Sequence, residues 1–211
     1  MSKKSNLYFL LFDSCKRHKY EEIQKQNPDF FGWVQMDSTE LDCPVMRSDE
    51  GNEKYLHADF YGNYSYAGTP FVDNNCTRDS DNILIYGHKL RDGSVFRSLL
   101  NYGEKAYWQE YPTIMFSDLY ADYEYEVMAA FYDRVYSSKE PGFRYYQFTD
   151  AADEEEFNYA INKYKEKFLY DNGVNASCGD KLITLSTCVY IVKQVRIRWW
   201  RMSAPRRWRM C

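Results

Sequence analysis

The sequence is poor in histidine and has no long apolar run. Only three histidines, His18, His57 and His88, occur among its 211 residues. The longest apolar stretch near the start covers residues 7–12, far short of the ~18 residues that a membrane-spanning helix needs. It is also too short for a convincing signal-peptide core. We therefore expect the chain as printed to be soluble and to carry no membrane anchor.

Metal-finger spacing is missing as well. The six cysteines, at positions 15, 43, 76, 178, 188 and 211, form no CxxC or CxxH pair, which argues against a structural zinc site. Their wide spacing, in a chain large enough to fold without cross-links, argues against a framework of three disulfides. Consecutive acids at 153–156 are more typical of a helix start, where they favour the helix dipole, than of a metal site. We predict neither a metal nor a cofactor.

Charge is distributed unevenly along the chain. Seven of the 27 basic residues lie in 193–211, which has no acid, so the other 20 stand against all 31 acids and residues 1–192 carry a net charge of −11. Three of the five tryptophans lie in the same last stretch. A basic, Trp-rich end can bind polyanions, but an acidic body repels them at long range. We therefore expect no nucleic-acid role.

The sequence pattern predicts many short strands with a few helices between them. Apolar, β-branched or alternating stretches predict strands at 30–36, 40–46, 82–86, 113–116, 123–136 and 181–187. Helices are predicted within 16–26, over 94–102 and over 151–170, the last with Asp150 as its N-cap. The 21 tyrosines are expected to serve strand packing and groove walls. These elements favour one mainly β domain, a β-barrel decorated by helices.

Three chemically useful side chains follow predicted strands. Cys188 ends the strand that starts at residue 181, His88 lies just past the strand over 82–86, and Arg196 and Arg198 come shortly after the cysteine. A thiol nucleophile, an imidazole acid/base and a permanent cation for an oxyanion form a complete set for acyl transfer. No histidine follows Cys188, so papain-like peptidases, whose cysteine precedes their histidine, fit poorly. Arg196 is the preferred arginine, and Arg198 stays open.

Two motifs make the sequence recognisable. Residues 184–188 read TLSTC, and residues 86–96 read YGHKLRDGSVF. Together they resemble signatures of class B sortases, the cysteine transpeptidases of Gram-positive cell surfaces. NPDFFGWVQM at 27–36, LDCPV at 41–45 and NEKYLHADFYGNYSYAGTPF at 52–71 are similar to the N-terminal half of that family. The resemblance covers roughly residues 20–196.

The resemblance implies a closed eight-stranded sortase barrel with N-terminal helices. It implies a helical segment over 1–26 and the catalytic barrel over 27–198. The basic, Trp-rich stretch over 199–211 departs from the Val-rich closing strand of that family, and we expect this tail to be disordered or not native. The family pattern makes Cys188 the nucleophile, His88 the general acid/base and Arg196 the oxyanion partner. It assigns substrate binding to four further residues: Asn52, Leu56, Ser186 and Thr187. His57 is expected to be structural.

For function, the resemblance implies cleavage of an NPxTx-like sorting motif at the threonine carbonyl. A thioacyl-enzyme would then pass the surface protein to an amine of the peptidoglycan stem or its precursor, at the extracellular face of the membrane. The full-length protein would be membrane-anchored. Three alternatives stay open: a pilin-polymerising class B sortase, a cysteine hydrolase on the same scaffold, and a catalytically impaired binding module.

Overall fold

The structure, a computed structural model, describes residues 20–89, 95–190 and 197–207, with side chains described only up to residue 187. Residues 20–26 are helical, and the chain then alternates short strands with 3-10 and α-helices. The strands are β1 Phe30–Gln35, β2 Asp42–Met46, β3 Phe71–Val72, β4 Asn82–Tyr86, β5 Thr113–Ser117, β6 Asp122–Glu126, β7 Ala129–Arg134, β8 Lys181–Tyr190 and β9 Ile197–Arg207. The helices are η1 Lys54–Leu56, η2 Ser98–Gly103, α2 Lys105–Glu110, η3 Tyr145–Gln147 and α3 Glu154–Lys167.

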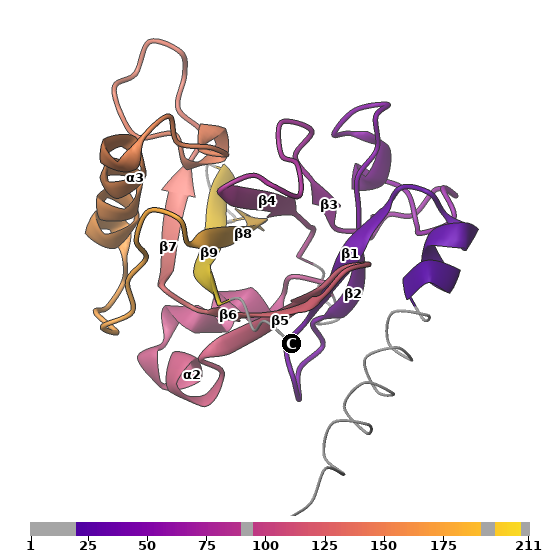
Figure 1. Ribbon diagram of the computed structural model, residues 1–211, viewed down its shortest axis with the longest axis horizontal. Helices are drawn as coiled ribbons and strands as arrows, with labels where there is room; N and C mark the ends of the chain where they lie inside the picture. The colour runs from indigo at the N-terminus through magenta and orange to yellow at the C-terminus, as the bar shows by residue number, and fades with distance from the viewer. Residues whose placement is uncertain (1–19, 90–94, 191–196, 208–211) are drawn as a thin grey trace, which may run out of the picture.

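The strands form a barrel. Their order is β6-β5-β1-β2-β3-β4-β8-β9-β7, and a further pairing between β6 and β9 closes a ring of eight strands, with β7 as a second partner of β9 (Figure 1). Closure gives each strand of this ring a hydrogen-bonding neighbour on both sides, which removes exposed sheet edges. The predicted fold, an eight-stranded sortase-type barrel with flanking helices, is confirmed.

The predicted strand over 123–136 is two strands. Both β6 and β7 pair antiparallel with β9, but the register slips between them: the six residues from Glu124 to Ala129 face the five residues from Arg207 to Ser203. A slip of this kind is a bulge, which bends a strand. The alternation of apolar and polar residues breaks at this bend, because residues 127–131 (VMAAF) are all apolar and buried.

The last barrel strand crosses the boundary that the sequence predicted at residue 198. β9 pairs with β8 over ten residues, from Ile197 opposite Tyr190 to Arg206 opposite Lys181. A ladder of this kind uses backbone N–H and C=O groups, so a basic and Trp-rich composition does not prevent it. Residues 208–211 lie outside the described part of the chain.

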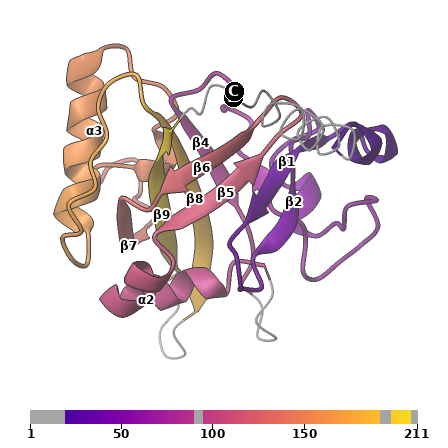
Figure 2. The same cartoon turned by 60° about the horizontal axis from the view of Figure 1, so that its bottom comes forward.

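Two apolar clusters sit on opposite faces of β8. Ile183 and Leu185 belong to the main core inside the barrel, with residues from β1 to β7. Leu182 packs with the second cluster, beneath α3 and η3. Figure 2 shows α3 lying along this side of the barrel. The strand is therefore buried on both faces, and its described side chains from Leu182 to Thr187 are all buried, Thr184, Ser186 and Thr187 included.

The helix predicted over 151–170 is confirmed as α3, but its cap is not Asp150. Asp153 caps the helix by accepting a hydrogen bond from the Glu156 amide. Asp150 instead accepts bonds from the Ser80 hydroxyl and the Asp81 amide. The segment predicted as a helix over 94–102 contains the 3-10 helix η2, which continues into α2.

The expected packing of the tyrosines is found only in part. The tyrosines pack as predicted in many places, yet Tyr61, Tyr64 and Tyr66 are 69%, 82% and 77% exposed. Within the described residues, none of the helices has the length and apolar character to cross a membrane.

Candidate active site

Parallel pairing of β4 with β8 brings two distant segments to one level. Tyr86, the last residue of β4, lies opposite Ser186, and the Gly87 amide donates to the Ser186 carbonyl at 3.0 Å. His88 and Cys188 each come two residues after this matched pair. The backbone of His88, just past β4, and that of Cys188, still within β8, therefore lie at the same level although the two residues are 100 positions apart in sequence.

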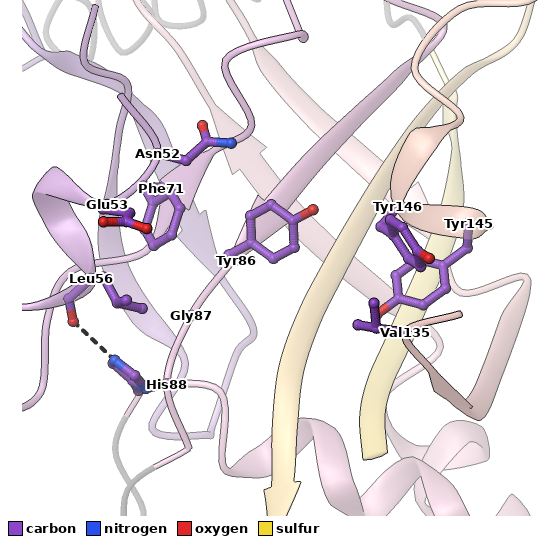
Figure 3. Close-up of a pocket in the computed structure, with 10 residues that line it drawn as sticks. All are labelled: Asn52, Glu53, Leu56, Phe71, Tyr86, Gly87, His88, Val135, Tyr145 and Tyr146. Atoms are coloured by element: carbon purple, nitrogen blue, oxygen red, sulfur yellow. Dashed lines mark hydrogen bonds between the residues drawn. The ribbon is translucent and has the colours of Figure 1, made fainter. Parts of the chain in front are cut away.

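The ring of His88 is anchored by a backbone carbonyl. Its Nε2 lies 2.9 Å from the Leu56 oxygen (Figure 3). Because a carbonyl can only accept, Nε2 must carry the proton, which leaves Nδ1 as the nitrogen that can exchange one. The half-buried ring is thus prepared for proton transfer at a defined atom.

A cleft of about 290 Å³ opens beside His88, at the lower end of the range for ligand pockets. One wall comes from η1 and the residues before it, and the opposite wall from η3 (Figure 3). Phe71 of β3 and the end of β4 lie between them. Its lining is largely apolar and aromatic: Asn52, Glu53, Leu56, Phe71, Tyr86, Gly87, His88, Val135, Tyr145 and Tyr146.

Close packing at Gly87 fixes the path of the chain into His88. A Cβ at this position would lie 2.7 Å from Cδ2 and 2.8 Å from Cε2 of the Phe96 ring. Phe96 is fully buried in the barrel core, so the ring has little room to move. The backbone is held on the other side by the bond from the Gly87 amide to Ser186.

Two of the four predicted substrate-binding residues line this cleft. Asn52 and Leu56 both stand on its η1 wall. The amide of Asn52 is also used within the fold: its Nδ2 donates to Asp73 at 3.2 Å and its Oδ1 accepts from the Asn74 amide at 2.7 Å. These bonds hold the Asn52 side chain in one orientation on the cleft wall.

The other two, Ser186 and Thr187, are both fully buried and neither lines the cleft. They lie on opposite faces of β8, because side chains alternate along a strand. The Ser186 hydroxyl lies 3.2 Å from the hydroxyl of Tyr145, a cleft residue. Thr187 is fully buried, and its Oγ1 lacks a hydrogen-bond partner among the described residues. It lies on the same face of β8 as Leu185, which packs into the barrel core. The structure does not bring Thr187 to the cleft.

The side chains of three predicted catalytic candidates, Cys188, Arg196 and Arg198, lie outside the described part of the structure. Arg196 falls in the undescribed segment 191–196, and only the backbones of Cys188 and Arg198 are described. Cys188 pairs with Trp199, and Arg198 pairs with Val189 on β8 and with Arg134 on β7.

Two of the other cysteines are poor nucleophiles. Burial raises the pKa of the Cys43 thiol and that of the Cys76 thiol to about 12. Both thiols therefore stay protonated near neutral pH, and a thiol is a poor nucleophile beside a thiolate. The third described free cysteine, Cys178, is exposed.

Sequence reasoning missed the aromatic wall and one histidine contact. Val135, Tyr145 and Tyr146 follow β7 and carry no motif that would assign them to the cleft. His57, expected to be structural, has an exposed side chain whose ring stacks on that of His88. Only its position next to Leu56 could have hinted at this contact.

Comparison with known proteins identifies the group to which the chain belongs. No family model matches it. Its sequence is 33% identical to sortase B of Listeria monocytogenes over 174 residues, 82% of this chain and 68% of that protein. Its fold is similar to a Staphylococcus aureus sortase B–substrate complex, with TM-score 0.78 and 25% identity over 90% of this chain and 85% of that chain. A sortase B complexed with triglycine gives TM-score 0.79 at 24% identity, covering 90% and 86%.

The barrel, the parallel pairing of β4 with β8, and the histidine beside an open cleft agree with this similarity. The extent and identity of the match to the Listeria protein show that this chain belongs to the sortase B family of cysteine transpeptidases.

Proposed function

We propose that this transpeptidase cleaves an NPxTx-like sorting motif at its threonine carbonyl and transfers the surface protein to a cell-wall amine. The observation that carries the proposal is the parallel register of β4 and β8, which sets His88 and Cys188 at one level beside the cleft. Such a protein acts on the extracellular face of the membrane, where surface proteins and peptidoglycan precursors meet.

In the first half of the reaction, the Cys188 thiolate attacks the threonine carbonyl. The tetrahedral intermediate collapses by breaking the peptide bond, and His88 gives its proton to the leaving amine. Arg196 stabilises the oxyanion while it exists. The bond between Nε2 and the Leu56 carbonyl assigns this proton transfer to Nδ1 of His88.

In the second half, an amine attacks the thioacyl-enzyme. His88, now neutral, takes a proton from the amine, and the Cys188 thiolate leaves as the new amide bond forms. Two solved relatives support both partners, since one was solved as a complex with a substrate and the other as a complex with triglycine. We propose a sorting peptide and a glycine-type amine for this chain.

The cleft wall suggests how the peptide is held. Asn52 and Leu56 present an oriented amide and an apolar side chain on one side, and Tyr145 and Tyr146 present aromatic rings on the other. We propose that Ser186, which contacts the cleft residue Tyr145 and precedes Cys188 by two residues, lies beneath the bound peptide near the scissile bond. An extended peptide between the two walls would then lead into the level of His88 and Cys188.

The test is intact-mass spectrometry after incubation with an NPQTN-type peptide, with and without triglycine. The expected result is a thioacyl adduct that triglycine resolves into a ligated product. Cys188→Ala should form no adduct while keeping the fold, whereas Cys178→Ala, which removes an exposed free thiol, should behave as the parent protein.

Other outcomes would contradict the proposal in distinct ways. An adduct resolved only by water would indicate a hydrolase on this scaffold. Substantial cleavage by Cys188→Ala would overturn the assignment of the nucleophile. A parent protein that neither cleaves nor forms an adduct would refute the proposed motif or the activity itself.

A further inference from the structure

The ring of His88 has a second contact besides the Leu56 carbonyl. The imidazole of His57 lies against it, with ring centroids 5.7 Å apart and ring planes inclined by 22°. This is an offset, nearly parallel stack, one of the arrangements that aromatic rings prefer. His57 itself is exposed, so this contact is not explained by packing in the core.

Both contacts with His88 come from one short segment. Leu56 is the last residue of η1, and His57 is its C-cap. The hydrogen bond and the ring stack are therefore delivered by consecutive residues. A shift of this segment would alter both contacts at once.

The segment is braced on several sides. The Tyr55 carbonyl accepts from the Thr69 amide at 3.0 Å, and the His57 carbonyl accepts from the Ser65 amide at 2.9 Å. Gly68, at φ +61°, packs so closely that a Cβ there would lie 2.5 Å from the Leu56 oxygen. An exposed side chain on a firmly held backbone is suited to positioning a neighbour.

We propose that His57 is a positioning residue whose ring, stacked on His88, fixes the plane in which His88 transfers its proton. This inference rests on the proposed role of His88 as the acid/base. The Leu56 carbonyl fixes one ring atom, but a single hydrogen bond leaves the imidazole free to turn about the line from Nε2 to the oxygen. A flat neighbour removes that freedom, so that Nδ1 keeps one direction.

The proposal requires a flat ring at position 57 rather than an ionisable group. His57→Phe keeps a ring that can stack, His57→Leu keeps apolar volume without a plane, and His57→Ala removes both. An aromatic pair contributes an amount that corresponds to roughly two- to tenfold in the population of the stacked orientation. We therefore expect His57→Ala and His57→Leu to lower kcat by about two- to tenfold with KM changed less than twofold. His57→Phe should recover most of the lost kcat.

A matched control comes from the same loop. Tyr64 is an aromatic residue with 82% of its surface exposed, and its ring is not part of the cleft lining. Tyr64→Ala should leave kcat and KM unchanged. Thermal unfolding of every variant should match the parent, because both side chains are exposed.

A readout independent of activity separates this inference from the proposed function. Long-range ¹H–¹⁵N NMR of the full chain reports the protonated nitrogen of His88, and nuclear Overhauser contacts report its proximity to His57. We expect a neutral His88 protonated at Nε2 and contacts between the two rings, with the His88 ring signals changed in His57→Ala and largely kept in His57→Phe.

The possible results distinguish the positioning role of His57 from the proposed function. Absence of ring contacts, or identical His88 signals in the parent and His57→Ala, would overturn the positioning role even in a protein that proved inactive. Equal losses of kcat in His57→Phe and His57→Ala would also overturn it. If the NMR contacts are found but the parent forms no thioacyl adduct, the stacking stands and the proposed function fails.

Discussion

Substituting Gly87 by alanine should disturb both the fold and the site. Gly87 connects β4 to His88, and a Cβ there would lie 2.7 Å from Phe96 Cδ2, where ordinary contacts are 3.4–4 Å. The backbone and the ring must therefore separate by about 0.7 Å. Neither can move freely, since Phe96 is fully buried and the Gly87 amide bonds the Ser186 carbonyl.

The expected size follows from that displacement. Overpacking of a well-packed core costs about 1–3 kcal/mol. For a domain of this size, each kcal/mol lowers Tm by about 2–4 °C, so Gly87→Ala should melt about 2–12 °C below the parent protein. A catalytic group displaced by about 1 Å can lose ~10²-fold in rate. We expect thioacyl formation to slow by about one to two orders of magnitude, because His88 is the next residue.

Calorimetry and single-turnover mass spectrometry would measure the two effects. Gly103→Ala is a matched control, because its Cβ would meet only the Tyr132 hydroxyl at an ordinary 3.5 Å. Adding Phe96→Leu to Gly87→Ala should restore part of the rate by making room for the methyl group. A Gly87→Ala protein with the Tm and acylation rate of the parent would refute this account of how His88 is placed.

Three smaller predictions follow from single contacts. The Arg134 guanidinium, together with the Ser137 amide, lowers the pKa of Glu140 from 4.5 to about 2. The Arg134–Glu140 ion pair therefore stabilises the segment before Tyr145 fully above pH 4.5, and this stabilisation is lost as the pH falls through about 2. Glu140→Gln should therefore speed hydrogen exchange over residues 137–147 at pH 7. Asp153→Ala removes the cap of α3 and should lower the free energy of unfolding by about 1 kcal/mol in urea titrations. Thr187→Val replaces a buried hydroxyl that lacks a partner among the described residues, and should leave peptide KM unchanged and raise stability by about 1 kcal/mol.

Local sequence patterns predicted most helices and strands. They did not predict the long-range contacts that determine which of two similar residues caps a helix. Asp150 and Asp153 are the same residue type just before α3, and either suits an N-cap. Asp150 is engaged by Ser80 and Asp81, about 70 positions earlier in the chain. Asp153 is left to cap the helix. No local rule contains that long-range choice, so the predicted cap was wrong while the helix was right.

The aromatic content was informative only in part. Tyrosine suits strands and groove walls, and Tyr145 and Tyr146 do line the cleft. The same residue type at Tyr64 stands in solvent. The difference lies in whether a neighbouring segment covers the ring, which depends on tertiary packing rather than on residue type. The composition therefore could not distinguish wall tyrosines from exposed ones.

The two motifs predicted that His88 and Cys188 meet, and the pairing of their strands agrees with this prediction. β4 and β8 are parallel neighbours in the sheet, so the residue after Gly87 and the residue two positions past Ser186 lie at one level. The facing wall depends on contacts of a different kind. Tyr145 is positioned by the Ser186 hydroxyl, and Asn82 donates to the Phe148 carbonyl just beyond η3. The aromatic wall therefore could not be predicted from the two motifs, because contacts with residues far away in the sequence hold η3 in place.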